Sequence, residues 1–178
     1  MLEDPQAGRQ FAPEYSQSSY EHMQSQDWAV GNYLEGTGPN ANFGYGERER
    51  LISIVQDLHK KKDYKPETLH LAGNLADRYL SLVLRKGESV PNLFVLGATV
   101  TLMAAKLEQP ISPSFNRMLA LLPPVEQART NKQDLVDLEE RILLALEFGL
   151  HAAGPIPFLE RFQRIFGLDQ EKADHDFK

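Results

Sequence analysis

The stretch NLFVLGATVTLMAAK, from Asn92 to Lys106, carries no charge before its final lysine. Drawn as a helix, it presents apolar side chains on every side and has no face suited to water. Such a helix must be surrounded by other helices, and small residues such as Gly97 and Ala104 let them approach closely. The stretch therefore predicts a buried central helix at about Leu93–Ala105.

Amphipathic segments lie on both sides of this central stretch. Their apolar residues recur at helical spacing, as Leu51, Val55 and Leu58 do. No segment alternates apolar and polar residues as a strand would. The sequence predicts an all-α fold of five helices, the central one included, followed by a short C-terminal helix. The other expected helices run over 47–62, from Pro66 through Leu82 with Gly87 at the end of the connection that follows, over 114–122 with a break at Pro123–Pro124, from Asn131 to about Gly149, and over 156–166.

Residues 1–46 form an acidic extension of a different composition. Its acidic residues are Glu3, Asp4, Glu14, Glu21, Asp27 and Glu35, against the one basic residue Arg9. Chain of this composition does not bury enough surface to fix its conformation, so we expect the extension to be largely flexible. Around Trp28 and Tyr33, apolar residues fall near helical spacing. That spacing favours a short helix near 26–35 that packs onto the body or onto a partner.

The composition also argues against several classes of function. A net charge of −6 disfavours binding to nucleic acid or to an anionic membrane. The chain has no cysteine, and its five histidines lie far apart, so we expect no metal site and no other cofactor. No apolar run is long enough to span a bilayer. No nucleophile–base motif is present, so the sequence predicts a binding module without a small-molecule substrate, not an enzyme.

Three blocks of the sequence together resemble the cyclin box. They are PETLHLAGNLADRYLS (66–81), GATVTLMAAKLEQ (97–109) and DLEERILLALEFGLHAAGPIPFLERF (137–162). The resemblance covers about residues 47–166 and implies a five-helix cyclin-like fold. It further implies a regulatory subunit that binds a cyclin-dependent serine/threonine kinase and activates it by positioning the kinase C-helix. Location in the nucleus or cytoplasm is expected on the same ground.

The resemblance also implies roles for individual residues. A lysine at the end of the third cyclin-box helix and a glutamate in the fifth contact the kinase, and the matching positions here are Lys106 and Glu139. Glu108 keeps the first of two acidic residues that follow the lysine in the family. Arg48 and Asp77 match a structural ion pair between the first two helices.

An interface also needs apolar residues beneath its charged anchors. We therefore expect Leu102, Leu135 and Ile142, which lie near Lys106 and Glu139 in the sequence, to belong to the kinase-binding surface.

Other features leave alternatives open. Many cyclins carry a substrate-docking patch with a tryptophan on the first helix, and Ile54 occupies that position here. This departure favours a second hypothesis, a cyclin-fold scaffold or adaptor in a larger assembly, without kinase activation. Residues 167–178 are either a polar tail or the start of a second repeat that the chain does not contain. The sequence does not identify the kinase.

Overall fold

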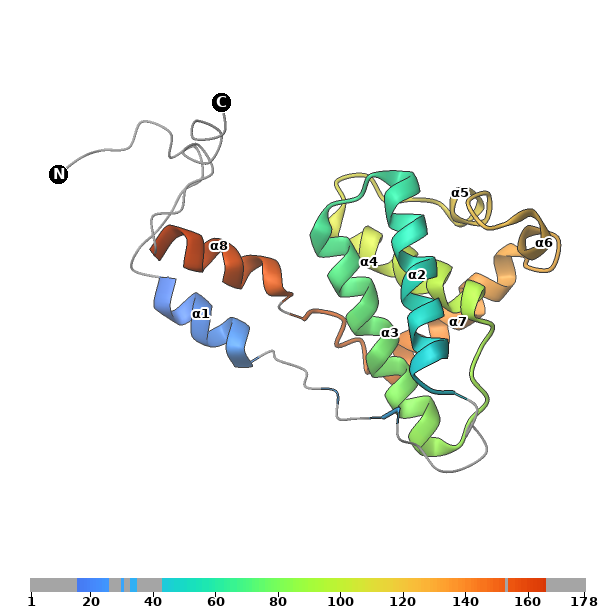
Figure 1. Ribbon diagram of the computed structural model, residues 1–178, viewed down its shortest axis with the longest axis horizontal. Helices are drawn as coiled ribbons and strands as arrows, with labels where there is room; N and C mark the ends of the chain where they lie inside the picture. The colour runs from blue at the N-terminus through green and yellow to red at the C-terminus, as the bar shows by residue number, and fades with distance from the viewer. Residues whose placement is uncertain (1–15, 26–29, 31–32, 35–42, 153, 166–178) are drawn as a thin grey trace.

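The computed structural model describes residues 16–25, 30, 33–34, 43–152 and 154–165, and Figure 1 shows their arrangement. Every regular element in these residues is a helix, as predicted. The helices are α1 (Ser16–Ser25), α2 (Tyr45–Lys62), α3 (Pro66–Lys86), α4 (Leu93–Glu108), α5 (Phe115–Leu119), α6 (Pro124–Gln127), α7 (Lys132–Ala145) and α8 (Pro155–Ile165). None of them combines the length and apolar character that crossing a bilayer requires.

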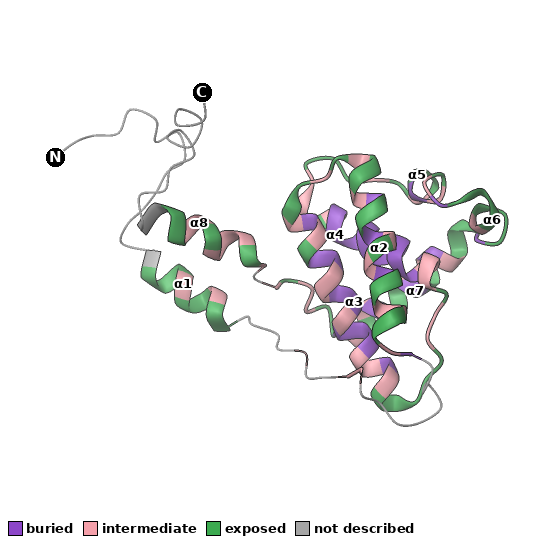
Figure 2. Ribbon diagram, viewed as in Figure 1, coloured by how far each residue is buried: buried purple, intermediate pink, exposed green. Residues whose placement is uncertain are grey.

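Helix α4 is the centre of the bundle. It packs against α2, α3, α5 and α7, and every residue from Leu96 to Ala105 is buried. In Figure 2 the buried residues gather where these helices meet. Asn92 caps the start of the helix, and its side-chain oxygen accepts a hydrogen bond from the backbone N–H of Phe94 at 2.8 Å. The prediction of a buried central helix is confirmed.

The connections before α4 follow common helix-end chemistry. Pro66 occupies the first position of α3, where a missing N–H costs no hydrogen bond. Gly87 ends the same helix in the left-handed conformation, with φ of 66°. The start agrees with the sequence prediction, whereas Gly87, expected at the end of the connection after this helix, ends the helix itself.

The region between α4 and α7 differs from the expected single helix over 114–122. Ser114 caps α5, which ends at Leu119, and a further helix, α6, begins at Pro124. Proline at the start of a helix is favourable because its φ is already helical. The Pro123–Pro124 pair therefore ends one segment and begins another.

Helix α7 ends at Ala145, earlier than the predicted end near Gly149. The N–H of Glu147 bonds to the carbonyl of Leu144 at 3.2 Å, and the N–H of Phe148 bonds to that of Leu143 at 2.9 Å. This is the hydrogen-bond pattern of a Schellman cap. Glu147 has φ of 51°, so a glutamate occupies the left-handed position that glycine usually fills.

The N-terminal region contributes a helix and a short segment that packs against the bundle. Tyr33 and Leu34 pack against the core of the bundle, as the apolar pattern around them allowed. Neither they nor Val30 is helical, and the rest of the expected helix near 26–35 lies outside the described residues. The helix of this region is instead α1, which the sequence analysis did not predict.

Helices α1 and α8 lie side by side and extend away from the bundle (Figure 1), and α8 contacts the bundle at α3. The rings of Tyr20 and Phe158 meet edge to face, with centroids 5.8 Å apart. The guanidinium of Arg161 lies 4.4 Å from the centre of the Tyr20 ring. The predicted C-terminal helix is therefore present, and its neighbour is the N-terminal helix. The predicted tail, 167–178, and most of the extension lie outside the described residues.

Candidate functional site

Lys106 and Glu139, predicted as a pair of contact residues, form an ion pair with each other. Lys106 lies in the last turn of α4, where a cation is favoured by the helix dipole, and Glu139 lies midway along α7. The Lys106 Nζ is 2.6 Å from Glu139 Oε1 and 2.8 Å from Oε2. Their side chains are 33% and 15% exposed, so the pair lies at the surface with its carboxylate mostly covered.

An aromatic ring completes this cluster. Phe115, the first residue of α5, places its ring centre 4.6 Å from the Lys106 ammonium. Lys132, the first residue of α7, lies 5.9 Å from the same ring. A cation near an aromatic face is stabilised by the negative potential of the ring. Three helices therefore hold the lysine in one position, and we refer to Lys106, Glu139 and Phe115 as the anchor cluster.

The anchor cluster has the chemistry of a binding site. The Lys106 ammonium has three donors, two of which point to Glu139, so one remains for a partner. The Glu139 carboxylate likewise retains lone pairs that can accept hydrogen bonds. Within the described residues, no group of three histidine or acidic side chains is arranged to hold a metal ion.

Three of the predicted contact residues lie in the core. Leu102, Leu135 and Ile142 are 0% exposed. Leu102 and Leu135 pack together in a buried cluster with Met118, and Ile142 belongs to the larger core cluster. Placing them on an interaction surface was wrong, because residues at helical spacing from a surface charge can face the interior. The buried cluster that contains Leu102 and Leu135 also contacts Phe115 of the anchor cluster.

Other apolar residues near Lys106 are exposed, and they were not among the predicted contact residues. Leu107 and Ile111 follow the lysine in the chain and are 41% and 78% exposed. Exposed apolar side chains beside a charged anchor are typical of interfaces. Their proximity to Lys106 was visible in the sequence, but their exposure depends on how α4 ends.

Glu108 lies apart from the ion pair. It lines a cleft of about 230 Å³ between α3 and the start of α8, together with Glu67, His70 and Asn74. The structure thus places this predicted contact residue at the end of α4 without bonding it to Lys106 or Glu139.

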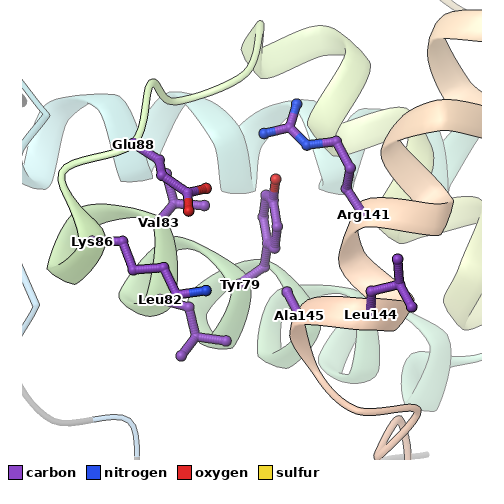
Figure 3. A pocket seen from close by; sticks show the side chains of 8 residues that line it. All are labelled: Tyr79, Leu82, Val83, Lys86, Glu88, Arg141, Leu144 and Ala145. Carbon is purple, nitrogen blue, oxygen red and sulfur yellow. The ribbon is translucent and has the colours of Figure 1, made fainter.

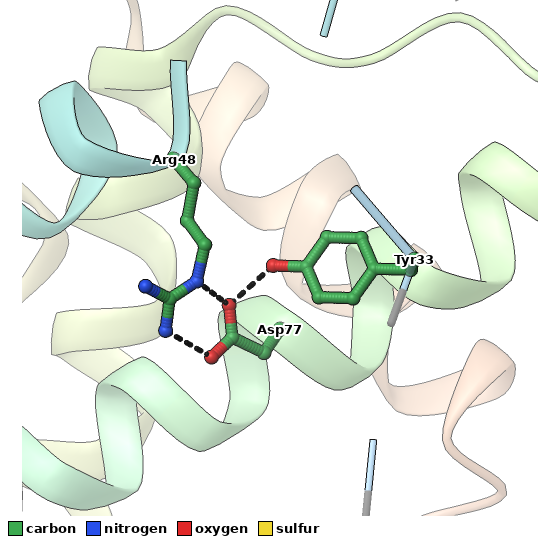
Figure 4. Close-up of polar contacts among 3 residues, drawn as sticks. All are labelled: Tyr33, Arg48 and Asp77. Carbon is green, nitrogen blue, oxygen red and sulfur yellow. Dashed lines mark hydrogen bonds and ion pairs between the residues drawn. The ribbon is translucent and has the colours of Figure 1, made fainter. Parts of the chain in front are cut away.

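Arg48 and Asp77 form the predicted structural ion pair (Figure 4). Arg48 on α2 donates two hydrogen bonds, from Nε and Nη2, to the two carboxylate oxygens of Asp77 on α3, each at 2.8 Å. This two-point geometry fixes both the distance and the orientation of the groups. The hydrogen bond to Asp77 raises the pKa of the Arg48 guanidinium above its ordinary value.

Tyr33 is a third member of this network. Its hydroxyl donates a short hydrogen bond to Asp77 Oδ1, as Figure 4 shows. Burial, and then the hydrogen bond to Asp77, raise the pKa of the Tyr33 hydroxyl well above its usual value. The sequence showed that Tyr33 could pack on the body, but it did not show that its hydroxyl reaches Asp77.

Comparison with known proteins adds independent information. Residues 18–151 match the family model described as the N-terminal domain of cyclins. The chain is 30% identical over 124 residues to G2/mitotic-specific cyclin-4 of Saccharomyces cerevisiae. The matched region covers 70% of this chain and 25% of the yeast protein. It is 32% identical over 129 residues to G2/mitotic-specific cyclin-B of Dictyostelium discoideum, again over 70% of this chain and 28% of that protein. The chain thus matches only about a quarter of the length of these relatives.

Proposed function

The chain belongs to the cyclin family, and we propose that it is a regulatory subunit that binds and activates a cyclin-dependent serine/threonine kinase. In this proposal the anchor cluster contacts the kinase and holds its C-helix in the active position. The ion pair between Lys106 and Glu139 carries the proposal, because it puts both predicted contact residues at one surface point.

The geometry of the cluster favours tight association. An ion pair that is already formed loses little side-chain freedom when a partner binds, so less of the binding free energy is lost to ordering. Leu107 and Ile111 would supply the apolar part of the contact, the role first expected of residues that lie in the core. Glu108 stays in the proposal as a peripheral acidic contact.

The proposal assigns regulation to this chain and phosphoryl transfer to the kinase. A kinase needs its lysine–glutamate ion pair and its metal-binding aspartate in place, and stabilising the C-helix supplies the first of these. We infer an intracellular role, in the nucleus or cytoplasm, where such kinases act. Binding of nucleic acid, membrane or a small-molecule substrate forms no part of the proposal.

The test is the charge reversal Glu139→Lys. It places two ammonium groups side by side and removes the acceptor, so binding to a panel of purified cyclin-dependent kinases should weaken by about 100-fold or more. Kinase activity on a peptide substrate should fall in parallel. The control is Glu140→Lys, the same charge change on the exposed adjacent residue of α7, which should leave binding nearly unchanged.

A double variant separates folding from recognition. Lys106→Glu combined with Glu139→Lys restores the internal ion pair in reverse, so helical circular dichroism should match the wild type and stability should fall only by the helix-dipole and aromatic contributions of Lys106. Kinase binding should stay lost, because the donor and the acceptor have changed places. Undiminished kinase binding by Glu139→Lys would contradict the proposal.

The scaffold hypothesis makes a different prediction. The lack of a tryptophan at Ile54 favours it, because the usual substrate-docking patch is altered there. A scaffold would recover other proteins from cell extract, bind no kinase in the panel, and be insensitive to Glu139→Lys.

A further inference from the structure

A second cavity lies between the C-terminal parts of α3 and α7, with a volume of about 300 Å³. Figure 3 shows the eight side chains that line it. Its walls include Leu82, Val83 and Ala145, and the exposed Leu144 forms part of its rim. The volume is at the lower end of the range for ligand sites and suits one or two side chains.

A buried hydroxyl points into this cavity. Tyr79 is only 2% exposed, yet its hydroxyl has no hydrogen-bond partner among the described residues. Leaving a buried polar group unpaired costs about 1–3 kcal/mol, so such a group commonly marks the place of a bound water or ligand. Burial raises the pKa of this hydroxyl, which keeps it protonated as a hydrogen-bond donor.

The charges around the hydroxyl define the chemistry of a ligand. Arg141 and Lys86 provide two cations, and Glu88 provides one anion. In Figure 3 the Tyr79 hydroxyl points toward the guanidinium of Arg141. A carboxylate could accept hydrogen bonds from both groups. The Glu88 carboxylate could accept a backbone N–H, and the aliphatic walls could receive an apolar side chain.

The cavity faces away from the anchor cluster. Arg141 follows Glu139 by two residues, which places the two side chains about 200° apart around α7. A ligand in the cavity therefore leaves the ion pair between Lys106 and Glu139 accessible.

We propose that this cavity is a docking site for a short peptide segment of a partner protein, in which an aspartate or glutamate lies next to an apolar residue. The acidic side chain bonds to Tyr79 and Arg141, and the apolar side chain packs against Leu82 and Leu144. The site is independent of the proposed kinase contact, so Glu139→Lys should leave peptide binding unchanged.

The test is a titration of the full chain, labelled with nitrogen-15, with two N-acetylated peptide amides, Leu-Asp-Leu and Leu-Asn-Leu. Backbone signals of Val83 and Leu144 should shift, and the acidic peptide should bind about tenfold more tightly than its neutral counterpart. Tyr79→Phe keeps the packing but removes the hydroxyl, so it should weaken binding of the acidic peptide. Arg141→Gln should remove the preference for the acidic peptide.

Control variants and ligands make the outcome decisive. Arg85→Gln makes the same charge change on α3 outside the cavity and should keep the preference for the acidic peptide. The proposal is overturned by an absence of shifts at the cavity, by equal binding of the two peptides, or by an equal effect of Arg85→Gln and Arg141→Gln. Isovalerate that binds as tightly as the peptide would show a small carboxylate site and would also overturn it.

Discussion

Asp77 on α3 links three parts of the chain: α3 itself, helix α2 through Arg48, and the segment before α2 through Tyr33. Its carboxylate accepts two hydrogen bonds from Arg48 and one from Tyr33. A carboxylate that is partly withdrawn from water needs such partners, because its desolvation costs several kcal/mol when they are missing. Removing one donor therefore weakens the network more than the loss of an exposed ion pair would.

At the residue scale, Tyr33→Phe tests this network through its pH dependence. Near neutral pH, losing a hydrogen bond to a charged group should lower the free energy of unfolding by about 1.5–3 kcal/mol. In the wild type, the raised pKa of Tyr33 means that the unfolded phenol ionises first. Stability from this residue is therefore present below about pH 10 and is lost as the pH rises further.

The measurement is urea unfolding of both proteins from about pH 7 to about pH 11. The difference in free energy of unfolding between the wild type and Tyr33→Phe should be constant up to about pH 9 and then decrease. Other tyrosines and the lysines titrate in both proteins, so the difference isolates Tyr33. A difference that stays constant up to the highest pH would contradict this account.

The contact between α2 and α4 depends on one glycine. A Cβ at Gly97 would lie 2.8 Å from Cγ2 of Ile54, closer than real side chains approach. The two helices therefore meet at a distance that only glycine permits. By contrast, a Cβ at Gly73 on α3 would lie 3.8 Å from Cδ1 of Ile52, an ordinary contact.

At the element scale, Gly97→Ala should destabilise the protein by about 1–3 kcal/mol, because the added methyl forces a shift between packed helices. An Ile54→Leu variant lacks the Cγ2 atom that would clash. In that background Gly97→Ala should lower the free energy of unfolding by less than about 1 kcal/mol. Denaturant unfolding of the wild type, the two single variants and the double variant measures the coupling between positions 97 and 54.

Gly73→Ala is the matched control for that cycle. It adds the same methyl to a helix without a clash, so it should be neutral or stabilise by up to about 1 kcal/mol. Equal costs of Gly97→Ala in both backgrounds would show that contact with Ile54 is not the cause.

The molecule as a whole consists of a closely packed bundle and a pair of helices beside it. The bundle shares buried clusters across α2, α3, α4 and α7, whereas α1 and α8 meet through the ring contact between Tyr20 and Phe158 and the side chain of Arg161. An aromatic pair of this kind contributes about 0.5–1.5 kcal/mol. The helix pair should therefore open locally without unfolding of the bundle.

At this scale, Phe158→Ala should accelerate amide hydrogen exchange in α1 and α8 by about 2- to 10-fold, the factor that corresponds to losing the ring contact. Exchange in α4 should not change. Leu159→Ala removes apolar atoms from an exposed neighbour and should have a smaller effect. Faster exchange throughout the bundle in Phe158→Ala would show that the pair and the bundle unfold together.

Much of the bundle could be predicted from the sequence, because hydrophobic periodicity is a local signal. The uncharged stretch from Leu93 to Ala105 has one stable environment, the interior of a helical bundle, and the structure places it there. Pro66 likewise acts through its own backbone geometry, so the start of α3 was predicted correctly, whereas Gly87 ends this helix and not the connection after it. The end of α7 was not, since Glu147 adopts the conformation expected of glycine.

The candidate site depended more on tertiary structure. The sequence resemblance identified Lys106 and Glu139, but their bond spans 33 positions and exists only because α4 and α7 pack together. The link from Tyr33 to Asp77 spans 44 positions and is set by the path of the chain before α2. Polar side chains at such separations carry no periodic signal, so packing alone decides which of them meet.

The burial of individual side chains shows most clearly what the sequence determines and what the tertiary structure determines. Leu102 and Leu107 are leucines on the same helix, yet one is fully buried and the other is exposed. The sequence by itself determined that α4 is a helix in the interior of an all-helical cyclin-type domain. Only the tertiary structure decided which side chains at its end are exposed, because that depends on which neighbouring helices cover each face.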